Sequence, residues 1–68
     1  MKVKIYECAF QRLKFLKEFD LKNFTIPQLN SFIIFNNFSY LVKQITYDYE
    51  IGIIEITIIE QSLNYRKQ

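Results

Sequence analysis

The stretch that decides the fold is ITYDYEIGIIEITIIEQ, residues 45–61. Its first part alternates apolar and polar residues up to Tyr49, which is the pattern of a strand with one buried face. Asp48 is typical of the start of a turn, and Gly52, the only glycine of the chain, adopts a positive φ without strain. Residues 53–60 then predict a second strand. The stretch therefore predicts a β-hairpin that closes the fold.

The isoleucines of the last predicted strand divide between its two faces. One face carries Ile54, Ile56 and Ile58, and the other carries Ile53 and Ile59, separated by Glu55 and Thr57. A face left in water would not hold two isoleucines, because burying each is worth roughly 1.5 to 3 kcal/mol. We therefore expect a cover over part of this second face. The candidates are the C-terminal tail through Leu63 and Tyr65, a second copy of the chain, or another protein.

Upstream of this stretch the apolar period slips by one residue. Phe38, Tyr40 and Val42 point one way, but the apolar set resumes at the odd positions Ile45, Tyr47 and Tyr49. A slip without a turn signal predicts a β-bulge at Lys43-Gln44, and hence a long, bent strand. Asn36-Asn37 predicts a two-residue turn, since asparagine tolerates positive φ, and residues 32–35 supply the partner strand.

The N-terminal third allows two interpretations. Residues 2–6 alternate lysine with apolar residues and predict a strand. Residues 9–20 fit a strand or an amphipathic helix almost equally, and we favour a strand because the first strand needs a hairpin partner. Pro27 and its polar neighbours predict a connecting segment. The expected fold is an all-β, strongly bent five-stranded antiparallel barrel-like sheet, with an α+β fold carrying a helix at about residues 9–20 as the alternative.

The length of 68 residues predicts a single small domain, residues 1–68, in which residues 61–68 form a polar tail. Hydrophobic residues make up 50% of the chain and aromatic ones 18%, so a core without disulfides is expected. The interior of so small a domain cannot hold every ring. Some apolar side chains are therefore expected at the surface, where a contiguous patch marks an interface.

The residue types argue against catalysis. The chain has no histidine and a single cysteine, Cys8, which is expected to pack as a small apolar residue. The carboxylates from Asp48 onward are expected to be solvated or to face lysines across strands. No phosphate-binding loop is possible with one glycine. We predict a protein that is not an enzyme and has no catalytic residue, metal site, cofactor or small-molecule substrate.

Location and source are inferred from composition. No segment has the pattern of a signal peptide or approaches the roughly 20 apolar residues of a membrane span, so a cytoplasmic protein without a membrane partner is expected. Abundant Ile, Lys, Asn, Phe and Tyr indicate an A+T-rich genome. A bacterium is predicted, or the cytoplasm of a bacterial host if a phage or mobile element encodes the chain.

Several of these features occur together from Ile26-Pro27 onward. That pair precedes the strand at residues 32–35, the turn at Asn36-Asn37 leads to the aromatic run at residues 38–42, and residues 45–48 precede the final strand. This pattern resembles that of short bacterial, phage and mobile-element proteins that form five-stranded Src-homology-three-like barrels. Where such proteins carry glycine in the hairpin turn, this chain has asparagine. The resemblance implies a fold and no activity.

The function expected is that of a protein-interaction module that binds and modulates a host protein and associates with itself, with a homodimer as the expected assembly. The interface residues predicted are Tyr49, Ile51, Ile53 and Ile59. The alternative is a small nucleic-acid-binding barrel that uses a basic face on the first two strands. That face would contain Lys2, Lys4, Arg12 and Lys14, with Tyr6 as a stacking ring.

Overall fold

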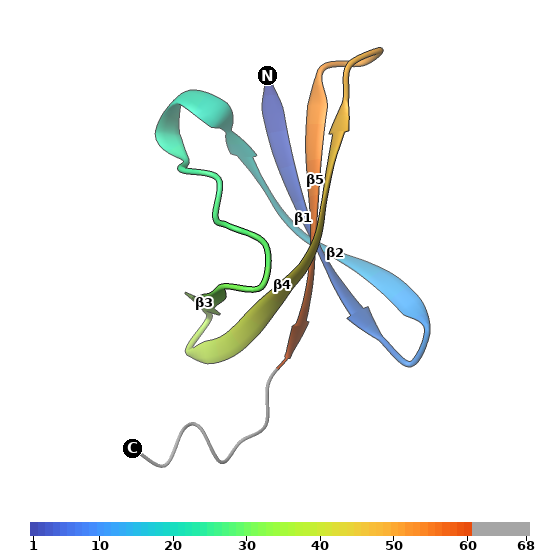
Figure 1. Cartoon of the computed structure of the whole chain (residues 1–68), viewed down its shortest axis with the longest axis vertical. Helices are drawn as coiled ribbons and strands as arrows, with labels where there is room; N and C mark the ends of the chain where they lie inside the picture. Colours follow the sequence, from blue (N-terminus) through green and yellow to red (C-terminus); the bar gives the residue numbers. More distant parts are fainter. Residues whose placement is uncertain (61–68) are drawn as a thin grey trace.

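The computed structural model describes residues 1–60 and contains five strands and one short 3-10 helix (Figure 1). The elements are β1 (Lys2–Ala9), β2 (Arg12–Asp20), η1 (Leu21–Asn23), β3 (Phe32–Phe35), β4 (Phe38–Asp48) and β5 (Ile53–Glu60). The predicted all-β fold is confirmed, and the alternative helix at residues 9–20 is wrong because β2 occupies most of that segment. The predicted tail, with its possible cover of β5 through Leu63 and Tyr65, lies outside the described residues.

The five strands form one sheet in the order β2-β1-β5-β4-β3, curled into a half-barrel with β2 and β3 at its edges. The β1–β2, β3–β4 and β4–β5 pairs are antiparallel, as expected, whereas β1 and β5 are parallel. The reason is that the chain reverses direction after each strand. The first and fifth strands therefore run the same way and can pair only in parallel, so the sheet is mixed.

Two β-bulges bend the sheet. The predicted one is confirmed, since the register of β4 against β5 shifts between Val42 and Gln44 and leaves Lys43 without a partner residue. A second bulge, which the sequence pattern did not indicate, lies in β2: Lys17 faces Ile5 of β1, Phe15 faces Tyr6, and Leu16 is the extra residue. Because a bulge reverses which side chains face the core, the second one changes the surface of β2.

Left-handed residues form the tight turns. Asn36 and Asn37 join β3 to β4 with φ of 52° and 69°, which confirms the predicted two-residue turn. Gly52 ends the β4–β5 connection with φ of 70°, and its N–H donates to the Asp48 carbonyl at 2.9 Å. The β1–β2 turn has the same left-handed geometry but uses Phe10 and Gln11, with φ of 53° and 62°.

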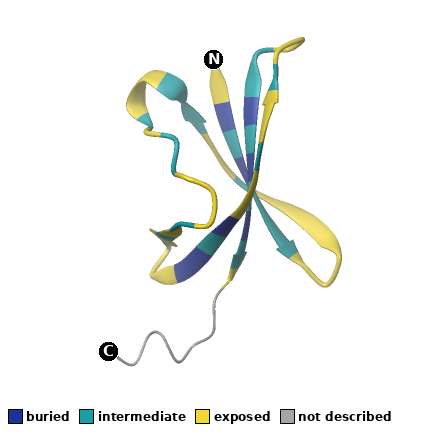
Figure 2. Cartoon of the chain, viewed as in Figure 1, coloured by how far each residue is buried: buried dark blue, intermediate teal, exposed yellow. Residues whose placement is uncertain are grey.

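The core lies on one side of the sheet, here called the core face, and the segment between β2 and β3 covers it (Figure 2). The buried apolar residues are Val3, Ile5, Tyr40, Val42, Ile54, Ile56 and Ile58. Leu21, Phe24 and Ile26 of the covering segment pack against them. Phe24 also stacks on Phe19 of β2, with ring centroids 4.8 Å apart. The prediction that Ile54, Ile56 and Ile58 face inward is confirmed.

Two backbone hydrogen bonds attach the end of the covering segment to β4. The N–H of Asn30 donates to the carbonyl of Val42 at 2.8 Å, and the N–H of Val42 donates to the carbonyl of Ser31 at 2.9 Å. Near the other end, the N–H of Leu21 donates to the carbonyl of Met1 at 3.0 Å. The segment is thus held at both ends. The opposite side of the sheet, here called the outer face, has no such cover within residues 1–60.

Candidate functional site

The strand registers define the outer face, because directly paired residues point to the same side of a sheet. Its members include Lys2, Lys4, Tyr6 and Cys8 of β1, Leu13, Phe15, Glu18 and Asp20 of β2, Ile53, Glu55, Thr57 and Ile59 of β5, Leu41, Gln44, Thr46 and Asp48 of β4, and Phe32 of β3. Its charged residues lie toward one end of the strands. The other end, near the β1–β2 turn, is largely apolar.

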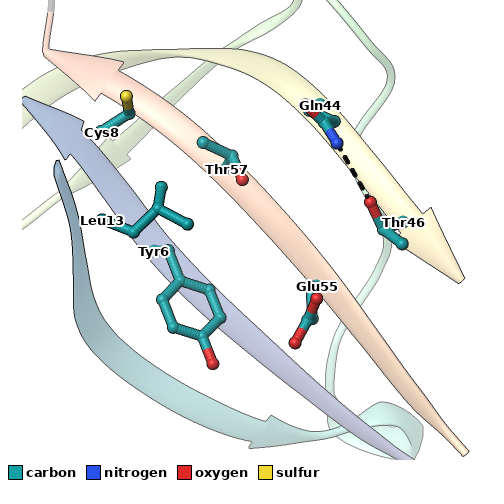
Figure 3. A pocket seen from close by; sticks show the side chains of 7 residues that line it. All are labelled: Tyr6, Cys8, Leu13, Gln44, Thr46, Glu55 and Thr57. Carbon is teal, nitrogen blue, oxygen red and sulfur yellow. Dashed lines mark hydrogen bonds between the residues drawn. The ribbon is translucent and has the colours of Figure 1, made fainter. Parts of the chain in front are cut away.

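A groove of about 390 Å³ crosses this face (Figure 3). It is lined by Tyr6, Cys8, Leu13, Gln44, Thr46, Glu55 and Thr57. Residues of β1 and β2 supply its apolar side, whereas β4 and β5 supply hydroxyl, amide and carboxylate groups. The Tyr6 ring meets Phe15 edge-on at 5.6 Å, and Gln44 Nε2 donates to Thr46 Oγ1 at 3.3 Å. Mixed walls of this kind are typical of binding sites rather than of the protein core.

The groups in the groove do not form a recognisable catalytic set. Glu55 is the one carboxylate that lines it and Cys8 the one thiol, and the chain has no histidine to act with either. Within residues 1–60 no three or more His, Cys, Asp or Glu residues are grouped so that they could hold a metal ion. The groove therefore offers shape and contact surface rather than an acid–base pair.

Among the titratable groups of residues 1–60, one is clearly perturbed, and it lies outside the groove. Burial raises the pKa of the Tyr40 hydroxyl above its usual 10.0, and the carboxylates of Glu7 and Glu60 raise it further. The hydroxyl therefore stays protonated at neutral pH. This is the behaviour of a buried structural tyrosine and adds no nucleophile to the outer face.

Exposed apolar side chains are unusually frequent in this domain. Within residues 1–60 seven hydrophobic residues form the buried core and eight more pack against it partly buried, yet eleven large hydrophobic residues are exposed. The exposed ones are Met1, Phe10, Leu13, Phe15, Leu29, Phe32, Ile34, Phe38, Tyr47, Tyr49 and Ile51. Nine of them gather at three places, the β1–β2 hairpin, the β3–β4 hairpin, and the β4–β5 turn with Tyr47 beside it. Gathered apolar side chains of this size mark interaction surfaces.

The predicted interface residues fall into two groups. Tyr49 and Ile51 are exposed in the β4–β5 turn, next to Tyr47, whose ring centroid is 6.4 Å from that of Tyr49. We call these three residues the turn patch. Ile53 and Ile59 are half-buried at opposite ends of the outer face of β5, so the structure does not bring them together.

Sequence reasoning missed two residues of these surfaces, Tyr47 and Phe10. Tyr47 pairs with Ile54 on the core face, and its alternation with Ile45 predicted burial, yet its side chain is 50% exposed. Phe10 was not assigned to a turn. The one available signal was its position between two alternating runs that had been expected to pair.

The predicted basic face does not form as one surface. Lys2 and Lys4 lie on the outer face, but the two-residue turn at Phe10-Gln11 pairs Arg12 with Ala9 and Lys14 with Glu7, so Arg12 and Lys14 point to the opposite side of the sheet. Lys2 Nζ lies 3.7 Å from a carboxylate oxygen of Glu18. Lys4 stands between Glu18 and Glu55 in the strand registers. Glu18 and Glu55 therefore lie beside Lys2 and Lys4 and reduce the positive charge of this part of the outer face.

A scan against protein-family models and searches of curated proteins and of solved structures found no match to this chain. The resemblance to Src-homology-three-like barrel proteins thus stays a prediction. Within the described part of the chain, no helix is long and apolar enough to cross a membrane.

Proposed function

We propose that this protein is a non-catalytic protein-interaction module. The observation that carries the proposal is that eleven large apolar side chains within residues 1–60 are exposed, six of them at the β1–β2 hairpin and at the β4–β5 turn with Tyr47 beside it. Apolar surface left in water stabilises nothing, and burial in a complex is worth roughly 25 cal/mol per Å². Contact with a protein partner accounts for this surface, whereas the groups in the groove suggest no reaction.

The turn patch is the surface that we assign to a protein partner. The Asp48 carboxylate holds the turn by accepting hydrogen bonds from the N–H groups of Glu50 at 3.1 Å and Ile51 at 3.4 Å. A turn that is already ordered loses little conformational entropy when it binds. Tyrosine is enriched at interface hot spots because it combines a large apolar ring with a polar hydroxyl. Tyr47 and Tyr49 supply two such rings.

The coding composition supports a bacterial cytoplasm as the setting, with a phage or mobile element as one source of the gene. In that setting a domain with this surface acts by covering part of a host protein. The effect on the host protein would be steric and would require no chemistry from this chain.

Affinity capture from a bacterial lysate tests the proposal. The tagged chain is compared with a Tyr49→Ser, Ile51→Ser double variant and with Leu29→Ser, which alters an exposed apolar residue of the covering segment. We expect a captured protein that the double variant loses and that the Leu29 variant retains. Equal capture by all three would contradict the assignment of the turn patch, and thermal melting would establish that each variant is folded.

A further inference from the structure

Phe10 occupies a position that its residue type does not favour. It has φ of 53° and is 96% exposed at the tip of the β1–β2 hairpin. A bulky side chain at positive φ is strained, and an exposed ring gains nothing from burial in return. The same chain places Asn36 and Asn37 at the equivalent positions of its other two-residue turn, where asparagine is well suited. Strain kept at an exposed position points to a function.

Phe10 adjoins a surface without charge. Cys8 pairs with Leu13 and Tyr6 pairs with Phe15, so these four side chains lie together on the outer face next to the tip. Leu13 is 62% and Phe15 is 49% exposed. With Phe10 they form what we call the hairpin surface, which borders the apolar side of the groove. The outer-face residues Lys2, Lys4, Glu18, Asp20 and Glu55 all lie toward the other end of the strands.

We propose that the hairpin surface binds a second copy of this chain, with Phe10 of each copy lying over Tyr6 and the groove of the other. Phe10 is two residues beyond Cys8 in the chain and Tyr6 is two residues before it. A two-fold axis above the Cys8–Leu13 pair therefore exchanges the positions of Phe10 and Tyr6. This is an isologous contact, in which one surface serves both copies.

The distribution of charge favours a second copy as the occupant. The hairpin surface is uncharged, so it can face itself without opposing like charges, while the charged residues stay at the rim of the contact. A strongly basic or acidic partner would find no complementary group at its centre. The proposal rests on the interaction function proposed above and assigns to it a surface distinct from the turn patch.

The area is sufficient for a reversible dimer. Taking the usual size of such side chains, Phe10, Leu13 and Phe15 together expose on the order of 400 Å² per copy. Two copies, with contributions from Tyr6, Cys8 and Thr57, approach the roughly 1,000 Å² at which specific interfaces begin. A contact of this size is expected to give a weak dimer, in equilibrium with the monomer at micromolar concentrations.

Sedimentation equilibrium of the full chain and of its Phe10→Asn variant tests the proposal. We expect the wild-type chain to dimerise and the variant to dimerise roughly a hundredfold more weakly or worse, since two rings lose their contact. Asparagine tolerates positive φ, so the variant should melt at the same or a higher temperature when both proteins are dilute and monomeric. Leu29→Ser serves as the matched control and should dimerise like the wild type.

A crosslink locates the axis. Facing sheets pack about 10 Å apart, so a short bis-maleimide should join the Cys8 thiols of two wild-type copies and should fail with Phe10→Asn at the same concentration. A wild-type chain that stays monomeric at millimolar concentration, a dimer unaffected by Phe10→Asn, or a wild-type dimer that does not crosslink would overturn the proposal. A monomer that still captures a partner through Tyr49 and Ile51 would overturn the dimer alone.

Discussion

Substitution of Ile56 by valine measures how unequally the two faces of β5 are covered. Ile56 is 0% exposed and lies between Ile5 of β1 and Ile45 of β4 in the registers. Removing one methylene leaves a small void in this packing, which costs about 1 kcal/mol of unfolding free energy. A domain of this length has only about 3 to 10 kcal/mol in total. The melting temperature should therefore fall by about 4 to 8 °C.

Ile53→Val removes the same group from the same strand on the outer face. Ile53 is only half-buried, between Lys2 and Asp48, so much of the removed surface was already in water. We expect a loss below about 0.5 kcal/mol. Thermal and urea denaturation followed by circular dichroism, at concentrations where the chain is monomeric, gives both values. Equal losses for Ile53→Val and Ile56→Val would refute the assignment of the core to one face.

Gly52→Ala should lower the free energy of unfolding by about 1 kcal/mol in urea titrations. An added Cβ meets no atom within 4 Å, so the whole cost comes from holding alanine at a φ of 70°. An unchanged urea midpoint would contradict a left-handed turn. Lys2→Ala should change the free energy of unfolding by less than about 0.5 kcal/mol, because its ion pair with Glu18 is exposed to solvent. A loss that grows at high salt would contradict this assignment. Because the pKa of Tyr40 is raised in the folded chain, the folded chain keeps the hydroxyl proton at a pH where the unfolded chain has lost it. The contribution of Tyr40 to the free energy of unfolding is therefore constant below pH 10 and falls above it. Tyr40→Phe should reduce this fall, and urea denaturation at pH 8 to 11 measures it.

Local patterns were sufficient for the closing hairpin. The alternation of residues 45–49, the single glycine and the apolar run of residues 53–60 predicted the second half of β4, its turn and β5, the last with its observed bounds. The slip of period identified the bulge at Lys43, and Asn36-Asn37 identified the other turn. These features depend on side-chain alternation and on the φ preference of a few residues, which are properties of short segments.

The candidate sites depended much more on tertiary structure. Tyr49 and Ile51 were predicted from the sequence, but the groove is assembled from four strands that are distant in the chain. The register of the β1–β2 hairpin separated Arg12 and Lys14 from Lys2 and Lys4, and the bulge at Leu16 placed Glu18 opposite Lys4; neither was predicted. A one-residue shift reverses the faces of a strand, and only pairing with β1 decides where it occurs.

The sequence alone thus determined the strands other than β2, most of the turns and the inward face of β5, because period and turn chemistry act over a few residues. Only the tertiary structure decided that β1 pairs in parallel with β5, that β2 is a strand rather than a helix, and that Phe10 stands exposed beside an uncharged surface. Those outcomes depend on which strands meet and in which register. Long-range packing sets that choice, since the competing local patterns were almost equally good.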